Sequence, residues 1–322
     1  MRVVDLFSGV GGLSLGLQNA GFDVVLAVDN WKPAITMYEA NFTHPIIDVD
    51  LLNVAAGLEI VKQYKPDMIV GGPPCQDYSS AGKRDEENGK ADLTISFAKI
   101  IEAIKPTYFI MENVDQIVKS RRYAEAMQLF KDAGYGLTAK TLDASLAGAP
   151  QKRKRHFVIG SLNHEDNFLM DTLMKNLSEK PTTIRDYLGE SLGVDHYYRH
   201  PRNYNRRGVY SIDEPSPTVR GVNRPFPPGY PGHKNDTSKE YAAVRPLTSK
   251  ERSLIQTFPE NFELIGTKGA IEQAIGNAVP VKLAEYVGNA LNEFLATTPQ
   301  LSKAEVFEPT PEPLVFALPE AA

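Results

Sequence analysis

Residues 3–12 of this 322-residue chain are Val3-Val4-Asp5-Leu6-Phe7-Ser8-Gly9-Val10-Gly11-Gly12, and this stretch decides the fold class. An apolar run of strand length ends in a glycine-rich turn, after which Leu13–Asn19 has a helical pattern that closes at Gly21. A second strand pattern, Asp23–Val28, follows. Strand, glycine turn, helix and strand in this order are typical of an α/β protein.

The rest of the first 160 residues repeats this alternation. Further apolar strand patterns and helical patterns alternate along the chain: Met68–Val70, Ser96–Ile104, Tyr108–Met111, Arg122–Ala133 and His156–Ile159. Alternation of short buried strands with helices predicts a parallel sheet that is covered on both faces.

The chain changes character after about residue 162. Much of its proline lies between residues 195 and 247, and a proline-rich segment cannot form regular helix or central strand. A helical pattern returns behind Pro280, and the Pro- and Glu-rich end predicts a disordered tail. We therefore expect a first domain from residues 1–162 and 246–296, a smaller loop-rich domain over 163–245, and a tail over 297–322.

Composition excludes several classes of protein. Apolar residues make up 42% and charged residues 23%, as in ordinary globular proteins, and no apolar run approaches the roughly 20 residues that span a bilayer. One cysteine excludes internal disulfides and a cysteine-rich zinc site. The chain begins directly with a strand pattern, which leaves no room for a signal peptide. We expect a cytoplasmic protein that binds neither membrane nor metal.

The net charge of −5 shows that the whole molecule is not a polycation. Nucleic-acid binding would therefore need a local basic surface.

The first chemical motif is the glycine turn together with Asp29. Ser14 occupies the third glycine position of the dinucleotide fingerprint, so the turn alone is also compatible with a plain strand–helix connection. Asp29 ends the second strand twenty residues after Gly9, where a carboxylate can accept hydrogen bonds from ribose hydroxyls. The pattern indicates a nucleoside-containing cofactor that lacks a pyrophosphate.

The second motif is Gly71-Gly72-Pro73-Pro74-Cys75-Gln76, directly after a strand. A lone cysteine is usually a small buried hydrophobe, but two prolines and a strand end favour a nucleophile here. Such a thiol needs nearby positive charge, which the stretch from Gln151 to Arg155 offers. Glu112, at the end of another strand, could serve as a general acid if burial raises its pKa.

Taken in order, five motifs resemble those of the DNA cytosine-5 methyltransferases of bacterial or phage type. The resemblance extends over roughly residues 1–296, and the motifs are Asp5–Gly12, Pro73–Gln76, Glu112–Val114, Gln151-x-Arg153-x-Arg155 and Gly276–Pro280. It implies a Rossmann-like methyltransferase sheet that uses S-adenosylmethionine, with a smaller target-recognition domain. It also implies transfer of a methyl group to carbon 5 of a cytosine that has been flipped out of duplex DNA.

The resemblance assigns roles to individual residues. Cys75 is the expected nucleophile, Glu112 the group that contacts N3 and the exocyclic amine, and Arg153 and Arg155 the supports of the activated base. The expected cofactor positions are Phe7, Ser8, Gly9, Gly11, Gly12, Asp29, Trp31, Asp48, Val49, Pro73, Asn277 and Val279.

The loop-rich segment is expected to recognise DNA. Arginine contacts phosphates and guanine edges, and tyrosine stacks and hydrogen-bonds, and both are frequent between Asp195 and Arg224. The expected DNA-contacting residues are Arg199, Arg202, Arg206, Arg207, Thr218, Arg220 and Arg224. Outside the resemblance, a basic loop region packed on itself is an equally good interpretation. We expect a monomer and a place in a restriction–modification system, a phage or an orphan methylation system.

Other functions remain as alternatives. An RNA cytosine-5 methyltransferase on the same scaffold comes second. A non-catalytic DNA-binding relative is disfavoured by the intact Cys75, Glu112 and Arg153, and a dinucleotide oxidoreductase is disfavoured by Ser14. A zinc nucleobase deaminase is excluded, because one cysteine cannot supply its ligands.

Overall fold

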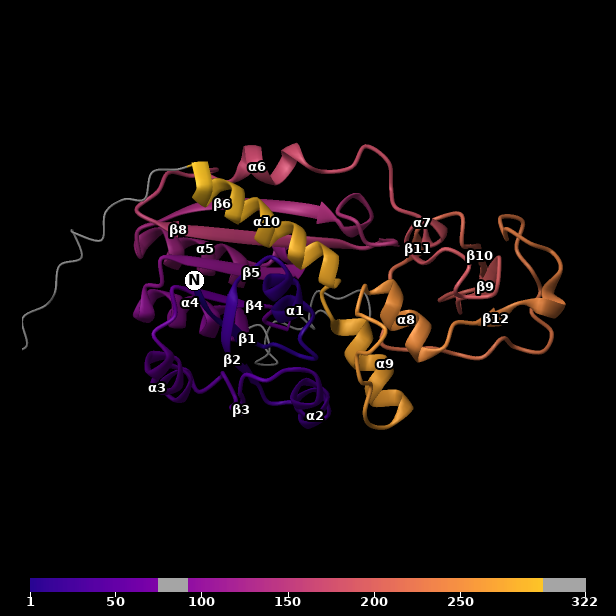
Figure 1. Ribbon diagram of the computed structural model, residues 1–322, viewed down its shortest axis with the longest axis horizontal. Coiled ribbons are helices and arrows are strands. Elements are labelled where there is room, and N and C mark those ends of the chain that lie inside the picture. Colours follow the sequence, from indigo (N-terminus) through magenta and orange to yellow (C-terminus); the bar gives the residue numbers. More distant parts are fainter. Residues whose placement is uncertain (75–91, 298–322) are drawn as a thin grey trace, which may run out of the picture.

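The computed structural model describes residues 1–74 and 92–297, and within them the largest feature is a seven-stranded sheet with helices on both faces (Figure 1). The strand order is β3-β2-β1-β4-β5-β8-β6. The strands are β1 (Arg2–Leu6), β2 (Asp23–Asp29), β3 (Ile46–Asp48), β4 (Met68–Gly71), β5 (Tyr108–Val114), β6 (Tyr135–Asp143) and β8 (Lys154–Leu162). The α/β class predicted from the sequence is confirmed.

One strand runs against the others, so the expectation of a wholly parallel sheet is wrong. β1 to β5 pair in parallel, whereas β8 is antiparallel to both β5 and β6. The chain between β6 and β8 contains only η2 (Ala144–Leu146) and the two-residue β7 (Gln151–Lys152). Parallel neighbours need a longer crossover, usually a helix, and without one the chain turns back as a hairpin.

Apolar helix faces cover both sides of the sheet. One cluster joins the sheet to α1 (Gly12–Asn19), α6 (Met170–Lys175) and α10 (Val281–Thr297). The other joins it to α3 (Val54–Tyr64), α4 (Asp92–Ile104) and α5 (Arg121–Asp132). α2 (Lys32–Asn41) precedes β3, and η1 (Asp115–Lys119) follows β5.

Two of the expected domain boundaries lie beside helices. Leu169 and Leu173 are fully buried in the core under α10. Therefore α6 packs with the large layer, by which we mean the seven-stranded sheet and the helices on its two faces, and not with the loop-rich segment that we expected to begin at 163. The reason is that α6 packs against α10, where Leu173 is buried. At the other end, α10 includes Thr297, and the rest of the predicted tail, 298–322, lies outside the described residues.

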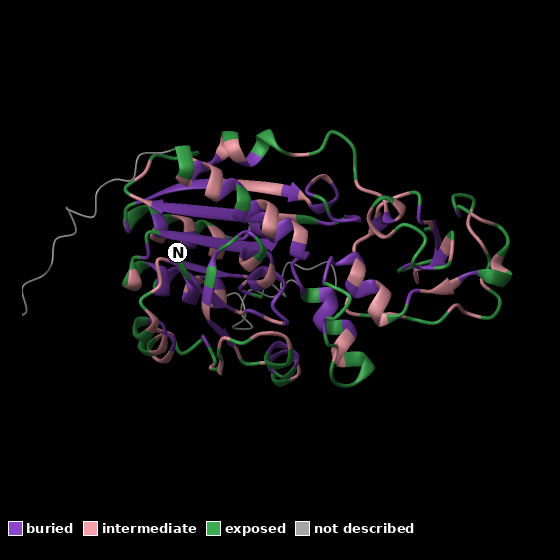
Figure 2. Cartoon of the chain, viewed as in Figure 1, coloured by how far each residue is buried: buried purple, intermediate pink, exposed green. Residues whose placement is uncertain are grey.

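The loop-rich segment extends away from the sheet and consists mainly of loops and turns (Figures 1 and 2). It contains α7 (Ile184–Leu188), β9 (His196–Tyr198), β10 (Val209–Ser211), β11 (Ser216–Pro217), η3 (Tyr241–Ala243) and β12 (Arg245–Pro246). A small sheet of order β10-β9-β12 is its regular part, and β11 pairs with β7 of the large layer. We use the name recognition segment for residues 184–247.

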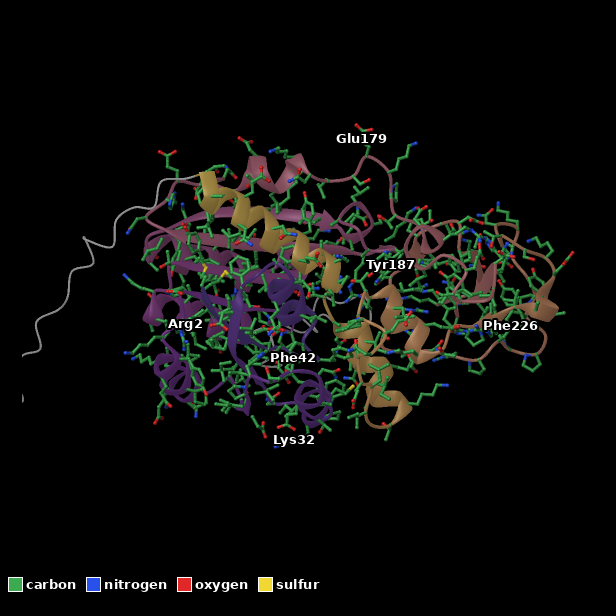
Figure 3. All side chains as sticks on the ribbon, in the orientation of Figure 1. Arg2, Lys32, Phe42, Glu179, Tyr187 and Phe226 are labelled. Atoms are coloured by element: carbon green, nitrogen blue, oxygen red, sulfur yellow. The ribbon has the colours of Figure 1, made fainter. Side chains whose placement is uncertain are left out.

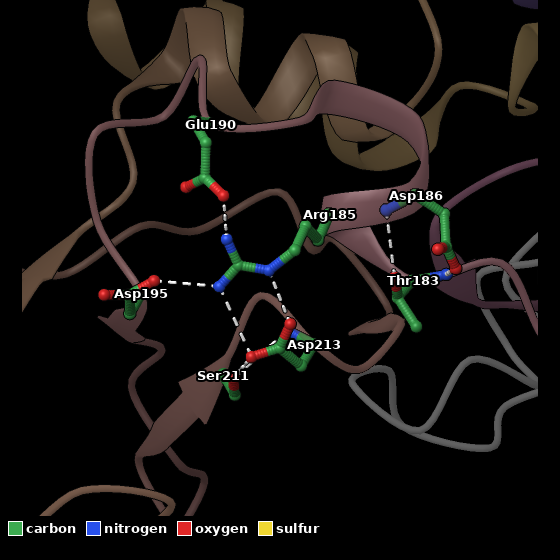
Figure 4. A network of polar contacts seen from close by, with 7 residues as sticks. All are labelled: Thr183, Arg185, Asp186, Glu190, Asp195, Ser211 and Asp213. Atoms are coloured by element: carbon green, nitrogen blue, oxygen red, sulfur yellow. Dashed lines mark hydrogen bonds and ion pairs between the residues drawn. The ribbon is translucent and has the colours of Figure 1, made fainter.

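Ionic contacts close the base of the recognition segment (Figure 4). The Arg185 guanidinium pairs with Glu190, with Asp195 at 2.8 Å and with Asp213 at 2.5 Å. These bonds raise the pKa of Arg185, with the hydrogen bond to Asp213 the largest cause. One cation therefore joins the two ends of the chain that forms β9 and β10.

Two short helices lie between the sheet and the recognition segment (Figure 1). These are α8 (Ser249–Ile255) and α9 (Lys268–Asn277). Ile255 of α8 and Ile275 of α9 share a buried cluster with Tyr197, Val219 and Leu247 of the recognition segment. The two layers are therefore joined by a continuous apolar contact.

Candidate active site

The turn after β1 has a backbone that few residues adopt. Phe7 has φ +59°, Gly9 +55° and Gly11 +89°. Positive φ is uncommon for a residue with a side chain, and such strain is often found at functional sites. A Cβ at Gly9 would meet no atom within 4 Å, so the turn leaves open space above Gly9.

Asp29 is fixed at the end of β2 by this turn. Its Oδ2 accepts a hydrogen bond from Gly9 N at 2.8 Å, and its Oδ1 accepts one from Trp31 N at 2.8 Å. Burial raises the pKa of Asp29, although the backbone N–H bonds oppose the shift. Asp48 lies beside it on β3 and pairs with Lys32, and Val49 N donates to Asp29 O at 3.2 Å.

The motif near the C-terminus also reaches the turn. A Cβ at Gly12 would clash with the carbonyl oxygen of Val279, so only glycine allows this approach. Asn277 ends α9 and is exposed, whereas Val279 is 7% exposed. The structure thus brings the cofactor residues expected from both ends of the chain to one edge of the sheet.

A nucleoside cofactor fits this group of residues. Ser8 Oγ is buried and has no hydrogen-bond partner among the described residues, so a polar ligand atom would satisfy it. The Asp29 carboxylate still has acceptor capacity for hydroxyl donors, and the aromatic side chains of Phe7 and Trp31 are only partly buried.

Glu112 is a buried acid at the same edge of the sheet, and it faces a basic group. It is 7% exposed, and its Oε1 lies 2.7 Å from Arg155 Nε. Burial raises the pKa of Glu112, although the charges of Arg155 and Arg153 oppose this. A carboxyl that keeps its proton closer to neutral pH is suited to general-acid chemistry.

The segment that leads to Cys75 is anchored to β5. Asn113 Nδ2 donates to Pro73 O at 2.9 Å, and a Cβ on Gly72 would lie 3.0 Å from Glu112 Oε2. Pro73 is buried, and Pro74 is exposed. Cys75, the expected nucleophile, lies outside the described residues, but the chain that carries it leaves β4 beside Glu112.

Arg153 has a different environment from Arg155. It is 1% exposed, and its Nη1 donates to Val219 O at 3.0 Å while its Nη2 donates to Gly276 O at 2.9 Å and Ala278 O at 3.0 Å. Burial and the Arg155 charge lower its pKa. The side chain therefore joins the β7–β8 strand to the recognition segment and to the motif that approaches Gly12.

Two glutamines that the sequence analysis did not single out as site residues complete this joint. Gln151 Nε2 donates to Gln256 Oε1 at 2.8 Å, and Gln151 Oε1 accepts from Val219 N at 2.8 Å. Gln256 Nε2 donates to Ala278 O at 3.1 Å. Both glutamines are fully buried. The signal for Gln151 is its spacing, two residues before Arg153 and four before Arg155.

Several arginines expected to contact DNA make internal bonds. Arg199 Nη2 donates to Thr218 O at 2.8 Å, and Arg220 donates to His200 O. Arg207 pairs with Glu214 at 2.6 Å and lies 4.2 Å over the Tyr210 ring. The Thr218 hydroxyl donates to Lys152 O at 2.8 Å.

The other three expected DNA contacts are exposed. Arg202, Arg206 and Arg224 lie on loops of the recognition segment, and Arg224 Nη1 is 3.4 Å from His200 Nε2.

Asp236 is a residue that organises the recognition segment and that the sequence analysis did not find. It accepts hydrogen bonds from Gly208 N, Val209 N and His233 N at 2.9, 3.0 and 2.8 Å.

Within residues 1–74 and 92–297, no cluster of three or more His, Cys, Asp or Glu side chains is arranged to hold a metal ion. Within the same ranges no helix is both long and apolar enough to cross a membrane.

Comparison with known proteins identifies relatives over nearly the whole chain. The sequence profile of the family described as C-5 cytosine-specific DNA methylase matches residues 1–293. The Type II methyltransferase M.HindV of Haemophilus influenzae is 58% identical over 295 residues, which cover 91% of this chain and 97% of that protein. The Type II methyltransferase M.HgiDI of Herpetosiphon aurantiacus is 52% identical, covering 92% and 95%.

Solved structures share the fold at lower identity. The S. pombe Dnmt2 methyltransferase has a TM-score of 0.68 at 18% identity and covers 92% of this chain and 99% of its own. The Entamoeba histolytica methyltransferase EhMeth has a TM-score of 0.68 at 17% identity, covering 92% and 98%.

Proposed function

The chain belongs to the C-5 cytosine-specific DNA methylases, and on this premise we propose how its residues divide the work of the reaction. It is an enzyme that methylates carbon 5 of cytosine in DNA. The methyl donor is S-adenosylmethionine, which when bound supplies an electrophilic methyl group. The observation that carries the proposal is the buried Glu112–Arg155 pair beside the chain that leads to Cys75.

The residues at the ends of β1 and β2 hold the cofactor. Asp29, oriented by Gly9 N and Trp31 N, accepts hydrogen bonds from the ribose hydroxyls. The cofactor would give Ser8 Oγ a hydrogen-bond partner, and the partly buried side chains of Phe7 and Trp31 would offer its base an apolar surface. Gly9, Gly11 and Gly12 give the ligand room, and the positions that complete the site are Asp48, Val49, Pro73, Asn277 and Val279.

Cys75 and Glu112 activate the base. Carbon 5 of cytosine is a weak nucleophile until the Cys75 thiolate adds to carbon 6 and N3 receives a proton, which the carboxyl of Glu112 supplies. Arg155 orients Glu112 through its 2.7 Å ion pair. After methylation, solvent takes the proton from carbon 5 and the bond between carbon 6 and sulfur breaks, which releases the Cys75 thiolate. The Glu112 carboxylate takes the proton back from N3.

Arg153 supports the activated base indirectly. Its guanidinium holds the main chain at Val219 and Gly276 while its charge acts on Glu112. The same bonds fix the recognition segment relative to Glu112.

Duplex DNA binds between the large layer and the recognition segment, with the target base flipped toward Glu112. Arg202, Arg206 and Arg224 contact the DNA, since they are exposed on one loop system. Arg199, Arg207, Thr218 and Arg220 shape this surface from within, because their polar groups have internal partners. We propose that the enzyme is a cytoplasmic monomer. The Type II methyltransferases among its relatives support a place in a restriction–modification system.

Bisulfite sequencing of plasmid DNA from cells that produce the chain tests the proposal. We expect 5-methylcytosine at every copy of one short sequence with wild type and none with Cys75→Ser. Methylation of RNA and not of DNA would favour the alternative substrate. Exchange of residues 184–247 for those of a relative with another target should move methylation to the new sites.

A further inference from the structure

A buried chain of hydrogen bonds runs under the glycine turn. Ser14 Oγ donates to Asp5 Oδ2 at 2.5 Å, Tyr38 Oη donates to Ser14 Oγ at 2.7 Å, and Tyr38 Oη is 2.6 Å from His44 Nε2. Asp5, Ser14 and Tyr38 are fully buried. They come from β1, α1 and α2, so one chain of hydroxyls connects three elements that surround the turn.

The hydrogen bonds of this buried chain all point the same way, from His44 toward Asp5. Because Tyr38 gives its proton to Ser14 and Ser14 gives its proton to Asp5, the Tyr38 oxygen is left to accept from His44 Nε2–H. Burial lowers the pKa of His44 and so favours the neutral ring, which in this arrangement carries its proton on Nε2. Burial also raises the pKa of Asp5 to about 7.

The ring of Tyr38 supports the turn from the side. A Cβ on Gly11 would come within 2.9 Å of Tyr38 Cε2 and closer still to Phe42, so the backbone of the turn lies directly on these two rings. Phe42, which is labelled in Figure 3, stacks on Tyr38 with ring centroids 4.1 Å apart. The hydroxyl of Tyr38 fixes where its ring stands, and the ring limits where Gly11 can lie.

The glycine turn also fixes the position of Asp29. Gly9 N, two residues before Gly11, is one of the two backbone donors that orient the Asp29 carboxylate. We infer that Tyr38 is a positioning residue for the binding of the methyl donor. Tyr38 acts on Asp29 through Ser14 and the Gly9–Gly11 turn. This inference rests on the proposed function, since it takes Asp29 as a ligand of S-adenosylmethionine.

Fluorescence of the single tryptophan measures the effect directly. Trp31 is the only tryptophan of the chain and binds Asp29 through its backbone N–H, so its emission reports cofactor binding without any turnover. Tyr38→Phe keeps the ring but removes the hydroxyl. We expect its dissociation constant for S-adenosylmethionine to rise about tenfold, the size of one buried hydrogen bond, with kcat at saturating cofactor within about twofold of wild type.

Tyr123→Phe is the matched control. Tyr123 Oη makes a similar bond to a histidine, 2.9 Å from His156 Nε2, on α5 over the opposite face of the sheet. We expect this variant to bind the cofactor as wild type does. Ser14→Ala interrupts the same chain as Tyr38→Phe, so the double variant should bind no more weakly than the weaker single one.

The possible results distinguish a failure of this inference from a failure of the proposed function. If wild type shows no saturable response to S-adenosylmethionine, the proposed function fails. If wild type binds and Tyr38→Phe binds equally well, the inference is overturned while the proposed function stands. A weaker affinity that Tyr123→Phe matches, with a similar fall in melting temperature, would assign the effect to general stability and would also overturn the inference.

Discussion

Arg155 Nε lies 2.7 Å from Glu112 Oε1, and the two side chains are only 13% and 10% exposed. Two opposed effects therefore act on one carboxyl, since burial favours its protonated form and the guanidinium favours its ionised form. Burial dominates and raises the pKa of Glu112. This balance sets the pH range in which Glu112 can supply a proton.

Removal of the Arg155 charge should shift the pH profile. Because Glu112 acts in its protonated form, kcat should fall as pH rises through its pKa. Arg155→Met removes the group that lowers this pKa, so the falling limb should move to higher pH, with a lower maximum rate. Lys154→Met, an exposed cation one residue away, should leave the limb in place. A limb that moves to lower pH in Arg155→Met would contradict the assigned roles.

Arg153 should matter for stability more than its exposed neighbour. Arg153→Ala leaves the carbonyls of Val219 and Gly276 without this donor, whereas Ala278 O keeps the bond from Gln256 Nε2. Each unpaired buried group costs about 1–3 kcal/mol. We expect the free energy of unfolding in urea to fall by about 3 kcal/mol or more. Lys152→Ala should change it by less than about 0.5 kcal/mol. Unchanged stability in Arg153→Ala would show that the joint is not structural.

The chemistry of the site was easier to predict from the sequence than the joints that hold it. Asp29 and Glu112 were found because each follows a short apolar strand, and parallel strands end at one edge of a sheet. β6 was missed because its Thr, Lys and Asp residues interrupt the apolar run, although pairing with β8 stabilises it. The direction of β8 was predicted wrongly, because it depends on the short connection between β6 and β8.

Roles of arginines could not be predicted from composition alone. Arg206 and Arg207 are neighbours in a basic stretch, yet Arg207 pairs with Glu214 and stacks on Tyr210 while Arg206 is exposed. Which side chain points inward depends on the turn geometry of residues 200–208, and no periodic pattern encodes it. The Tyr38–Ser14–Asp5 chain was equally hidden, since its members are far apart in sequence and meet only in the fold.

The two adjacent arginines should therefore behave differently in DNA binding. Arg206→Ala should lower the slope of log affinity against log salt by about 0.9, the value for one phosphate contact. Arg207→Ala should instead lower the melting temperature, because it removes the Glu214 pair and the Tyr210 contact. Equal slopes for wild type and Arg206→Ala in a titration from low to high salt would place Arg206 away from the backbone.

We expect Asp236 to be essential for the folding of the recognition segment and to have no effect on the affinity for the cofactor. Burial opposes its ionisation, but bonds from Val209, Gly208 and His233 outweigh this and lower its pKa. Its stabilisation should thus be complete at neutral pH and be lost only as pH falls below about 4 through the lowered pKa. Asp236→Ala should cost about 2 kcal/mol or more and abolish DNA binding.

The control for this variant is Glu240→Ala, an exposed acid four residues away. It should change neither stability nor DNA affinity. Trp31 fluorescence should report normal binding of S-adenosylmethionine in both variants. DNA binding by Asp236→Ala at wild-type affinity would show that the loops it joins do not contact DNA.

Covalent trapping on a fluorinated duplex tests the central claim most directly. In the proposed reaction Cys75 adds to carbon 6 of a cytosine in DNA, and the proton on carbon 5 must leave before the thiolate can. With 5-fluorocytosine at the target position and S-adenosylmethionine present, wild type should form a stable protein–DNA adduct, visible as a shifted band in a denaturing gel. Cys75→Ser should form none. Adduct formation by Cys75→Ser, or turnover of the fluorinated duplex by wild type without an adduct, would contradict the account.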